Sequence, residues 1–106
     1  MAATLIVLIA AAGLEIGGDA AIRRGLIGSQ SRWLVLGAAV LVAYGFVVNV
    51  NRSIEFGRLM GLYIAVFFIV SQISSYVFFG ERPSISLMVG GALIAAGGMI
   101  IQWGAR

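Results

Sequence analysis

Four long apolar stretches alternate with short polar ones along the 106-residue chain. They cover residues of about 3–22, 33–50, 59–79 and 85–103. Each has about 18–21 residues, which in a helix rising 1.5 Å per residue is enough to cross a hydrocarbon layer of roughly 30 Å. The pattern predicts a single all-α domain over residues 1–106, built as a bundle of four transmembrane helices.

The composition agrees with a bilayer as the solvent. Hydrophobic residues make up 61% of the chain and charged residues 10%, whereas a soluble domain averages about 25% charged residues. A soluble chain of this length would have a large surface to cover with these few charges. Trp33 and Trp103 fall at the ends of predicted spans, as expected of aromatic residues at the headgroup level. We therefore expect membrane lipids as partners.

Arginine supplies all seven positive charges and is divided almost evenly between the two expected sides of the membrane. The loops expected at 23–32 and 80–84 share one side, and the loop at 51–58 shares the other with both termini. The first side holds Arg23, Arg24, Arg32 and Arg82, and the second holds Arg52, Arg58 and Arg106. A difference of one positive charge leaves two interpretations open. Either there is a weak preference for the first side in the cytoplasm, or both orientations are made.

The sequence lacks the residue types that several classes of chemistry require. The chain has no Cys and no His, so disulfides, thiol chemistry and ordinary transition-metal sites are not expected. It has no nucleotide-binding glycine motif and no nucleophile–base pair, and neither a basic face nor an aromatic platform for nucleic acid. We therefore expect that the chain is not an enzyme, and that it has no cofactor and no nucleic-acid partner.

Two carboxylates interrupt the first apolar stretch. Glu15 lies near its middle, and Asp19 is four residues later on the same helical face. An acid at membrane depth is costly and marks a functional site by default, so Glu15 is the first candidate for binding a proton or a cation. Two acids this close should take up protons as a coupled pair. For Asp19 we favour an ion pair with Arg23, one turn further on, over a role in binding.

Aromatic and hydroxyl groups could line a cation site around Glu15. Tyr63, Phe67 and Ser71 follow helical spacing along the third stretch, and aromatic rings attract cations. The alternative is ordinary ring packing, with the serine hydroxyl bonded to its own helix. Tyr44 in the second stretch is a further candidate for the wall of the site.

Glycines repeat every seven residues in the last stretch. Gly90 and Gly97 form one such pair, and Gly91 and Gly98 form another. Small residues at this spacing make a smooth surface for a second transmembrane helix. We favour contact between two subunits through Gly90 and Gly97 over contact within one chain.

The chain resembles the small multidrug resistance family of drug/metabolite transporters, and also related four-span inner-membrane proteins. The resemblance covers nearly the whole length. It rests on Glu15 with Gly17 in the first stretch, Gly57 and Tyr63 in the third, FFGER at 78–82 and GGALIAAGGMII at 90–101. It implies an antiparallel homodimer in the bacterial inner membrane, made in both orientations. In such a dimer Glu15 would be shared between proton and cationic substrate, Tyr63 would belong to the binding face, and Gly90 and Gly97 would lie at the dimer contact.

These features together predict a proton-coupled antiporter that exports small cationic or hydrophobic-cation substrates. A small membrane subunit or assembly partner without transport activity is the alternative, as is a subunit of a flippase for lipids or lipid-linked sugars. An antiporter requires a Glu15 that exchanges protons, and a structural subunit does not.

Overall fold

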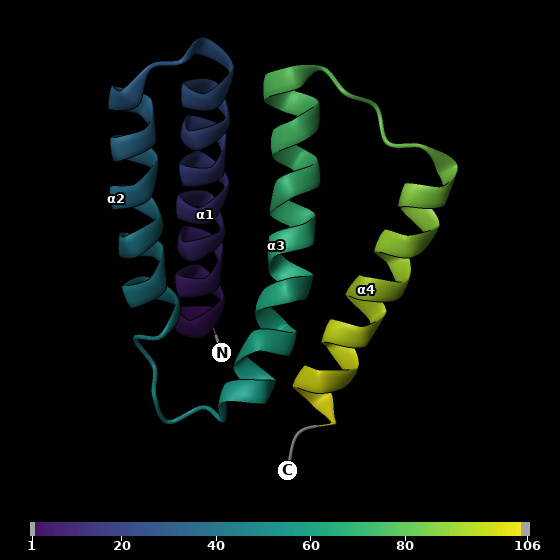
Figure 1. Cartoon of the computed structure of the whole chain (residues 1–106). Helices are drawn as coiled ribbons and strands as arrows, with labels where there is room; N and C mark the ends of the chain where they lie inside the picture. The colour runs from purple at the N-terminus through teal and green to yellow at the C-terminus, as the bar shows by residue number, and fades with distance from the viewer. Residues whose placement is uncertain (1, 105–106) are drawn as a thin grey trace. The chain divides into compact units, whose positions relative to one another are not determined.

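The computed structural model describes residues 2–104, which are all-α with no strand among them. The four helices are α1 (Ala2–Gly28), α2 (Ser31–Val48), α3 (Phe56–Phe79) and α4 (Ile85–Trp103) (Figure 1). Each is long and apolar enough to cross a membrane, which confirms the predicted class of four spanning helices. Arg106, counted above among the loop charges, lies outside the described residues. The chain divides into two compact units, Met1–Asn51 and Arg52–Arg106, and the prediction of a single domain stays a prediction.

The first helix is longer than predicted. It was expected to end near residue 22, but it continues to Gly28, so that only residues 29 and 30 separate it from α2. The predicted loop at 23–32 is therefore wrong. Hydropathy locates the end of the apolar stretch, whereas Arg favours helix and extends its aliphatic stem along the helix surface. Arg24 shows this, because its guanidinium lies 4.6 Å from the centre of the Trp33 ring, at the start of α2.

The end of α1 requires a left-handed residue. The backbone N–H of Gln30 donates to the carbonyl oxygen of Gly25 at 3.0 Å, which is the long hydrogen bond of a Schellman motif. Ser29 occupies the C′ position of this motif with φ 53°. A side chain at positive φ is strained, because Cβ comes close to the backbone.

In the loop between α3 and α4, the left-handed position is occupied by glycine. Gly80 ends α3 at φ 66°, and its N–H donates to the carbonyl oxygen of Tyr76 at 3.1 Å. Ser84 then caps α4, its hydroxyl oxygen accepting a hydrogen bond from the N–H of Leu87 at 3.1 Å. Both ends of the connection are thus satisfied locally.

Exchanging the residues at the two left-handed positions should change stability in opposite directions. Ser29→Gly should stabilise the protein and Gly80→Ala should destabilise it, each by about 1 kcal/mol, because only glycine adopts positive φ without a Cβ clash. Denaturation by SDS in mixed micelles, followed by far-ultraviolet circular dichroism, measures both. Shifts of the same sign in the two variants would contradict the explanation.

Glycines bring α1 and α2 into close contact. A Cβ on Gly37 would lie 2.5 Å from Cγ1 of Ile22 and 2.8 Å from the carbonyl oxygen of Gly18. A Cβ on Gly18 would lie 2.7 Å from the side chain of Leu41. The two backbones therefore approach at a point where neither helix carries a side chain, as is common for transmembrane helices.

The second hairpin packs through a different set of small residues. A Cβ on Gly61 would lie 2.7 Å from Ile101, and one on Gly98 would lie 2.5 Å from the Cβ of Ala65. Near the same end a guanidinium nitrogen of Arg58 donates to Gln102 Oε1 at 3.5 Å. In Figure 1, α3 and α4 lie closest at this end and diverge toward the Gly80–Ser84 loop.

Candidate proton and cation site in α1

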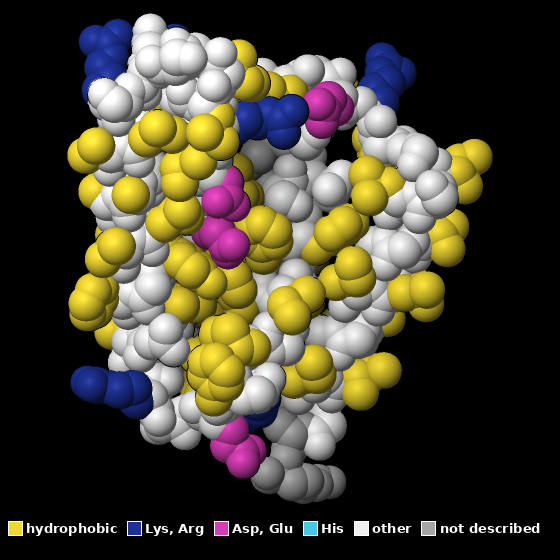
Figure 2. Space-filling model, viewed as in Figure 1, with side chains coloured by type: hydrophobic (Ala, Val, Ile, Leu, Met, Phe, Trp, Pro, Cys, Tyr) yellow, Lys and Arg dark blue, Asp and Glu magenta, His cyan; other side chains and the backbone are white. Residues whose placement is uncertain are grey.

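Glu15 is the central residue of α1 and is half-buried. On the same side of the helix, Ala11, Ala12 and Gly18 are buried, so the carboxylate stands among small side chains. Figure 2 shows acidic side chains in magenta among hydrophobic ones partway along the helices, whereas Arg side chains in dark blue lie near helix ends. A carboxylate at this level of a membrane-spanning helix lies far from both headgroup regions.

The α1–α2 packing places Tyr44 level with Glu15. Gly25 lies against Leu34, Gly37 against Ile22, and Gly18 against Leu41. From one contact to the next, the residue number in α1 falls by three and then by four, and the residue number in α2 rises by the same amounts. One further step of three residues reaches Glu15 in α1 and Tyr44 in α2. Tyr44 is half-buried, so this register supports its selection as a wall of the site.

Asp19 lies one turn from Glu15 toward the end of α1, and its side chain is exposed. Arg23, the partner predicted for it, is also exposed. Within residues 2–104 the structure shows no ion pair between the two side chains. The prediction that Asp19 is neutralised by Arg23 is therefore not met, although i, i+4 spacing places them on neighbouring turns. Both side chains are exposed, and holding them in one ion pair costs side-chain entropy, so this pairing is weak.

The predicted row on α3 consists of packed residues. The rings of Tyr63 and Phe67 contact each other with centroids 5.9 Å apart and planes at 43°. Tyr63 is buried, and the hydroxyl of Ser71 donates to the carbonyl oxygen of Phe68 at 2.7 Å. The observed interactions are thus those of the alternative, in which the rings pack together and the serine hydroxyl bonds to its own helix. Their proposed role around Glu15, which belongs to the other unit, stays a prediction.

The glycines of α4 form two pairs that differ in what lies next to them. Gly91 and Gly98 face Phe68 and Ala65 of α3, and any Cβ there would clash. Nothing lies within 4 Å of a Cβ placed on Gly90 or Gly97. The pair predicted to contact a second subunit is therefore the one left open within the chain.

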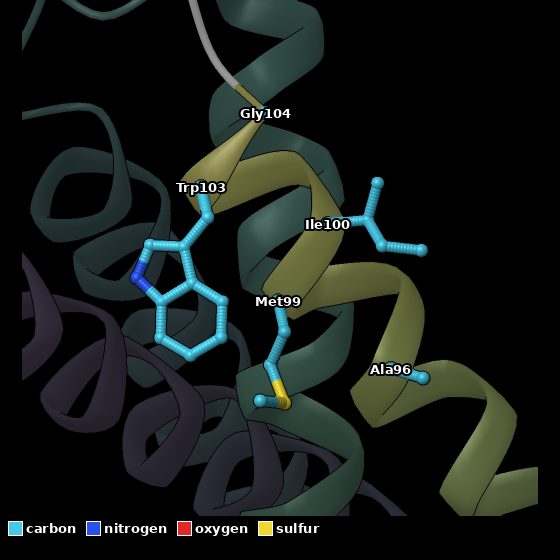
Figure 3. Close-up of a pocket in the computed structure, with 5 residues that line it drawn as sticks. All are labelled: Ala96, Met99, Ile100, Trp103 and Gly104. Carbon is cyan, nitrogen blue, oxygen red and sulfur yellow. The ribbon is translucent and has the colours of Figure 1, made fainter.

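A shallow hollow runs along the last two turns of α4 (Figure 3). It is lined by Ala96, Met99, Ile100, Trp103 and Gly104. These residues offer no charged group, and they lie on a side of α4 away from the glycines that contact α3. The hollow therefore offers no carboxylate that could exchange a proton for a cation, and the acidic residues of α1 remain the candidate site.

Few groups in the chain could hold a metal ion. Among the described residues no three His, Cys, Asp or Glu side chains come together. The candidate site to be tested is Glu15, with Asp19 on the same helix and Tyr44 across the hairpin. Sequence spacing predicted the first two as a pair, whereas the position of Tyr44 depends on the register of the hairpin.

Comparison with known proteins identifies bacterial relatives along nearly the whole chain. A UPF0060 membrane protein of Frankia casuarinae is 31% identical over 104 residues, which is 97% of this chain and 94% of the relative. A UPF0060 membrane protein of Streptomyces avermitilis is 38% identical over 95 residues, or 88% of this chain and 83% of the relative. One of Herpetosiphon aurantiacus is 34% identical over 104 residues, covering 95% and 94%. No family model matches the chain, and no solved structure gives a significant match.

Proposed function

We propose that this chain, which belongs to the family of UPF0060 membrane proteins and is a multi-pass membrane protein of bacteria, exchanges protons for small cations across the membrane. The names of its relatives state a membrane protein and specify no substrate. The proposal rests on the chain's own residues and on the resemblance to small multidrug resistance transporters.

The observation that carries the proposal is the carboxylate of Glu15 at the centre of a helix that can span a membrane. An ionised carboxylate in hydrocarbon is costly, and it needs a compensating positive charge. A bound cation supplies that charge, and a bound proton removes the need for it. Glu15 thus alternates between two ligands that exclude each other.

This exclusion converts a proton gradient into cation export. Deprotonated Glu15 binds the cation from one side, and protonation from the other side displaces it. Because one group serves both ligands, the proton weakens cation binding as strongly as the cation weakens proton binding. Apparent cation affinity should therefore fall as the pH is lowered. Tyr44 supports the same site, because the register of α1 and α2 brings position 44 level with Glu15 and a tyrosine ring can attract a cation.

We also propose that two copies of the chain assemble through the open glycines of α4 into an antiparallel homodimer. Gly90 and Gly97 leave a strip without side chains, and among the described residues nothing lies within 4 Å of a Cβ placed on either glycine. The nearly equal Arg counts on the two sides favour insertion in both orientations, as an antiparallel pair requires.

Gly97→Leu should reduce the dimer by about tenfold without disturbing the subunit. A Cβ on Gly97 would have no described atom within 4 Å, so the effect of the larger side chain should fall mainly on the contact between copies. Cross-linking in mild detergent measures the dimer fraction, and circular dichroism checks the helices. Ala96→Leu, one residue away on a different side of α4, is the matched control. Equal dimer yield in both variants and wild type would exclude this surface.

Transport is tested with the purified protein in liposomes. A gradient of a membrane-impermeant organic cation, such as tetraethylammonium, is imposed, and a pH-sensitive dye trapped inside reports proton movement. We expect protons to move in the direction opposite to the cation, and we expect no such movement in protein-free liposomes. Cation binding with no proton flux across a panel of cations would favour a structural or assembly role instead.

A further inference from the structure

Three arginines lie at the end of the first hairpin, where α1 meets α2. Arg23 and Arg24 belong to the last two turns of α1, and Arg32 belongs to the first turn of α2. All three side chains are exposed, and within residues 2–104 neither Arg23 nor Arg32 has a partner for its charge. This end of the hairpin therefore carries positive charge that the chain itself does not balance.

Acidic residues are absent from this part of the sequence. Residues 20–54 contain no Asp or Glu, whereas in the loop between α3 and α4 Glu81 stands directly before Arg82. The acid closest in sequence is Asp19, which lies one turn deeper in the helix than Arg23 and does not pair with it. A partner of this surface must therefore bring the negative charge.

The length of α1 places the three arginines at the level of lipid headgroups. Its 27 residues extend over about 40 Å at 1.5 Å per residue, close to the roughly 40–45 Å of a bilayer with its headgroup regions. Leu26 and Ile27 follow Arg24 and are 68% and 77% exposed, and such large apolar side chains favour lipid over water. The end of the hairpin therefore stays in the headgroup layer, where phosphates are the anions within reach.

Backbone and side-chain donors at the same turn also lack acceptors. Gln30, the N-cap residue of α2, makes no side-chain hydrogen bond to the first turn, which has a positive end-of-helix charge. The indole N–H of Trp33 is buried and has no acceptor among the described residues. Buried donors without an acceptor are rare in folded proteins, so an oxygen from outside the chain is expected here. The guanidinium of Arg24 lies at the same level, 4.6 Å from the centre of the Trp33 ring.

We propose that the surface formed by Arg23, Arg24 and Arg32 binds the headgroup of an anionic phospholipid. Guanidinium groups bind phosphate oxygens through paired hydrogen bonds. A zwitterionic headgroup brings its own ammonium group and leaves the charge of the turn unbalanced, whereas phosphatidylglycerol brings only the charge of its phosphate. The surface therefore selects lipids by net charge, and this selection does not depend on proton exchange at Glu15.

Trp33 becomes the only tryptophan of the chain when Trp103 is replaced with Phe. The full-length Trp103→Phe protein is reconstituted in phosphatidylcholine vesicles that contain a minor fraction of either phosphatidylglycerol or phosphatidylcholine with brominated acyl chains. Bromine quenches tryptophan fluorescence at close range, so the quenching measures which lipid lies beside Trp33. The brominated phosphatidylglycerol should be enriched there about fivefold over the brominated phosphatidylcholine.

Replacing both Arg23 and Arg32 with Gln in this protein should abolish the enrichment. Each single replacement should lower it in part, and serves as the test if the double variant does not fold. Replacing both with Lys keeps the charge and should keep most of the enrichment. The matched control replaces Arg52 and Arg82 with Gln, which removes the same charge from the other two loops and should leave the enrichment unchanged.

Three results would overturn the inference. The first is no enrichment in the Trp103→Phe protein, and the second is enrichment that survives neutralisation of Arg23 and Arg32 or falls equally in the matched control. The third is displacement of the lipid by inorganic phosphate beyond the effect of sodium chloride at the same ionic strength, which would assign the surface to a soluble anion. Exchange at Glu15 is measured separately and stands or falls without this result.

Discussion

Replacing Glu15 with Gln should reduce cation-driven proton release in liposomes to the level of protein-free vesicles. Glutamine has nearly the shape of glutamate but can neither release a proton nor carry a negative charge. The variant should also lose the pH dependence of cation binding, because proton and cation are proposed to compete for this one group. Stopped-flow recording of an internal pH dye measures the first effect, and titration calorimetry at several pH values measures the second.

The fold should tolerate this substitution. A neutral amide costs less than a carboxylate in hydrocarbon, so the helices should be as stable as in the wild type or slightly more so. Glu55→Gln is the matched control, because Glu55 precedes α3 in the loop after α2 and lies outside the spanning helices. It should leave proton release unchanged.

Two results would contradict the assignment. Proton release that persists in Glu15→Gln would mean that another group carries the proton. A loss of exchange of monovalent cations in Asp19→Asn, with Glu15→Gln still active, would reverse the roles of the two acids.

The lengths of the apolar stretches predicted the existence and type of all four helices, because crossing the hydrocarbon layer imposes a minimum apolar length. The boundaries of α4 were predicted as the structure has them, and α3 starts three residues earlier than expected. α2 ends two residues earlier than expected, where Asn49 Nδ2 donates to the carbonyl oxygen of Gly45 at 2.8 Å. The large error was the end of α1, because hydropathy does not report where a helix carrying Arg stops.

The candidate site was only partly accessible from sequence. Spacing alone places Glu15 and Asp19 on one side of α1. The inference that Tyr44 is level with Glu15 depends on the hairpin register, which is determined where Gly18 and Gly37 meet. The two glycine pairs of α4 look alike in sequence, and only packing against α3 distinguishes Gly91 and Gly98 from the open pair.

The same packing makes Gly37→Ala the substitution with the largest expected effect on stability. Its Cβ would lie 2.8 Å from the carbonyl oxygen of Gly18, and backbone cannot move aside as a flexible side chain does. Overpacking at a close contact costs typically 1–3 kcal/mol, and we expect about 3 kcal/mol because the obstacle is backbone. SDS denaturation of the reconstituted protein, followed through circular dichroism, measures the change.

Gly45→Ala provides the control for that measurement. It lies in the same helix, and nothing is within 4 Å of a Cβ placed there. Alanine favours helix over glycine by about 1 kcal/mol, so this variant should be unchanged or slightly more stable. If Gly37→Ala separated α1 from α2, it would also move Tyr44 away from Glu15, and cation affinity should then fall together with stability. Equal stability of the two alanine variants would mean that α1 and α2 do not approach each other at Gly37. The register that brings Tyr44 level with Glu15 would then be wrong as well.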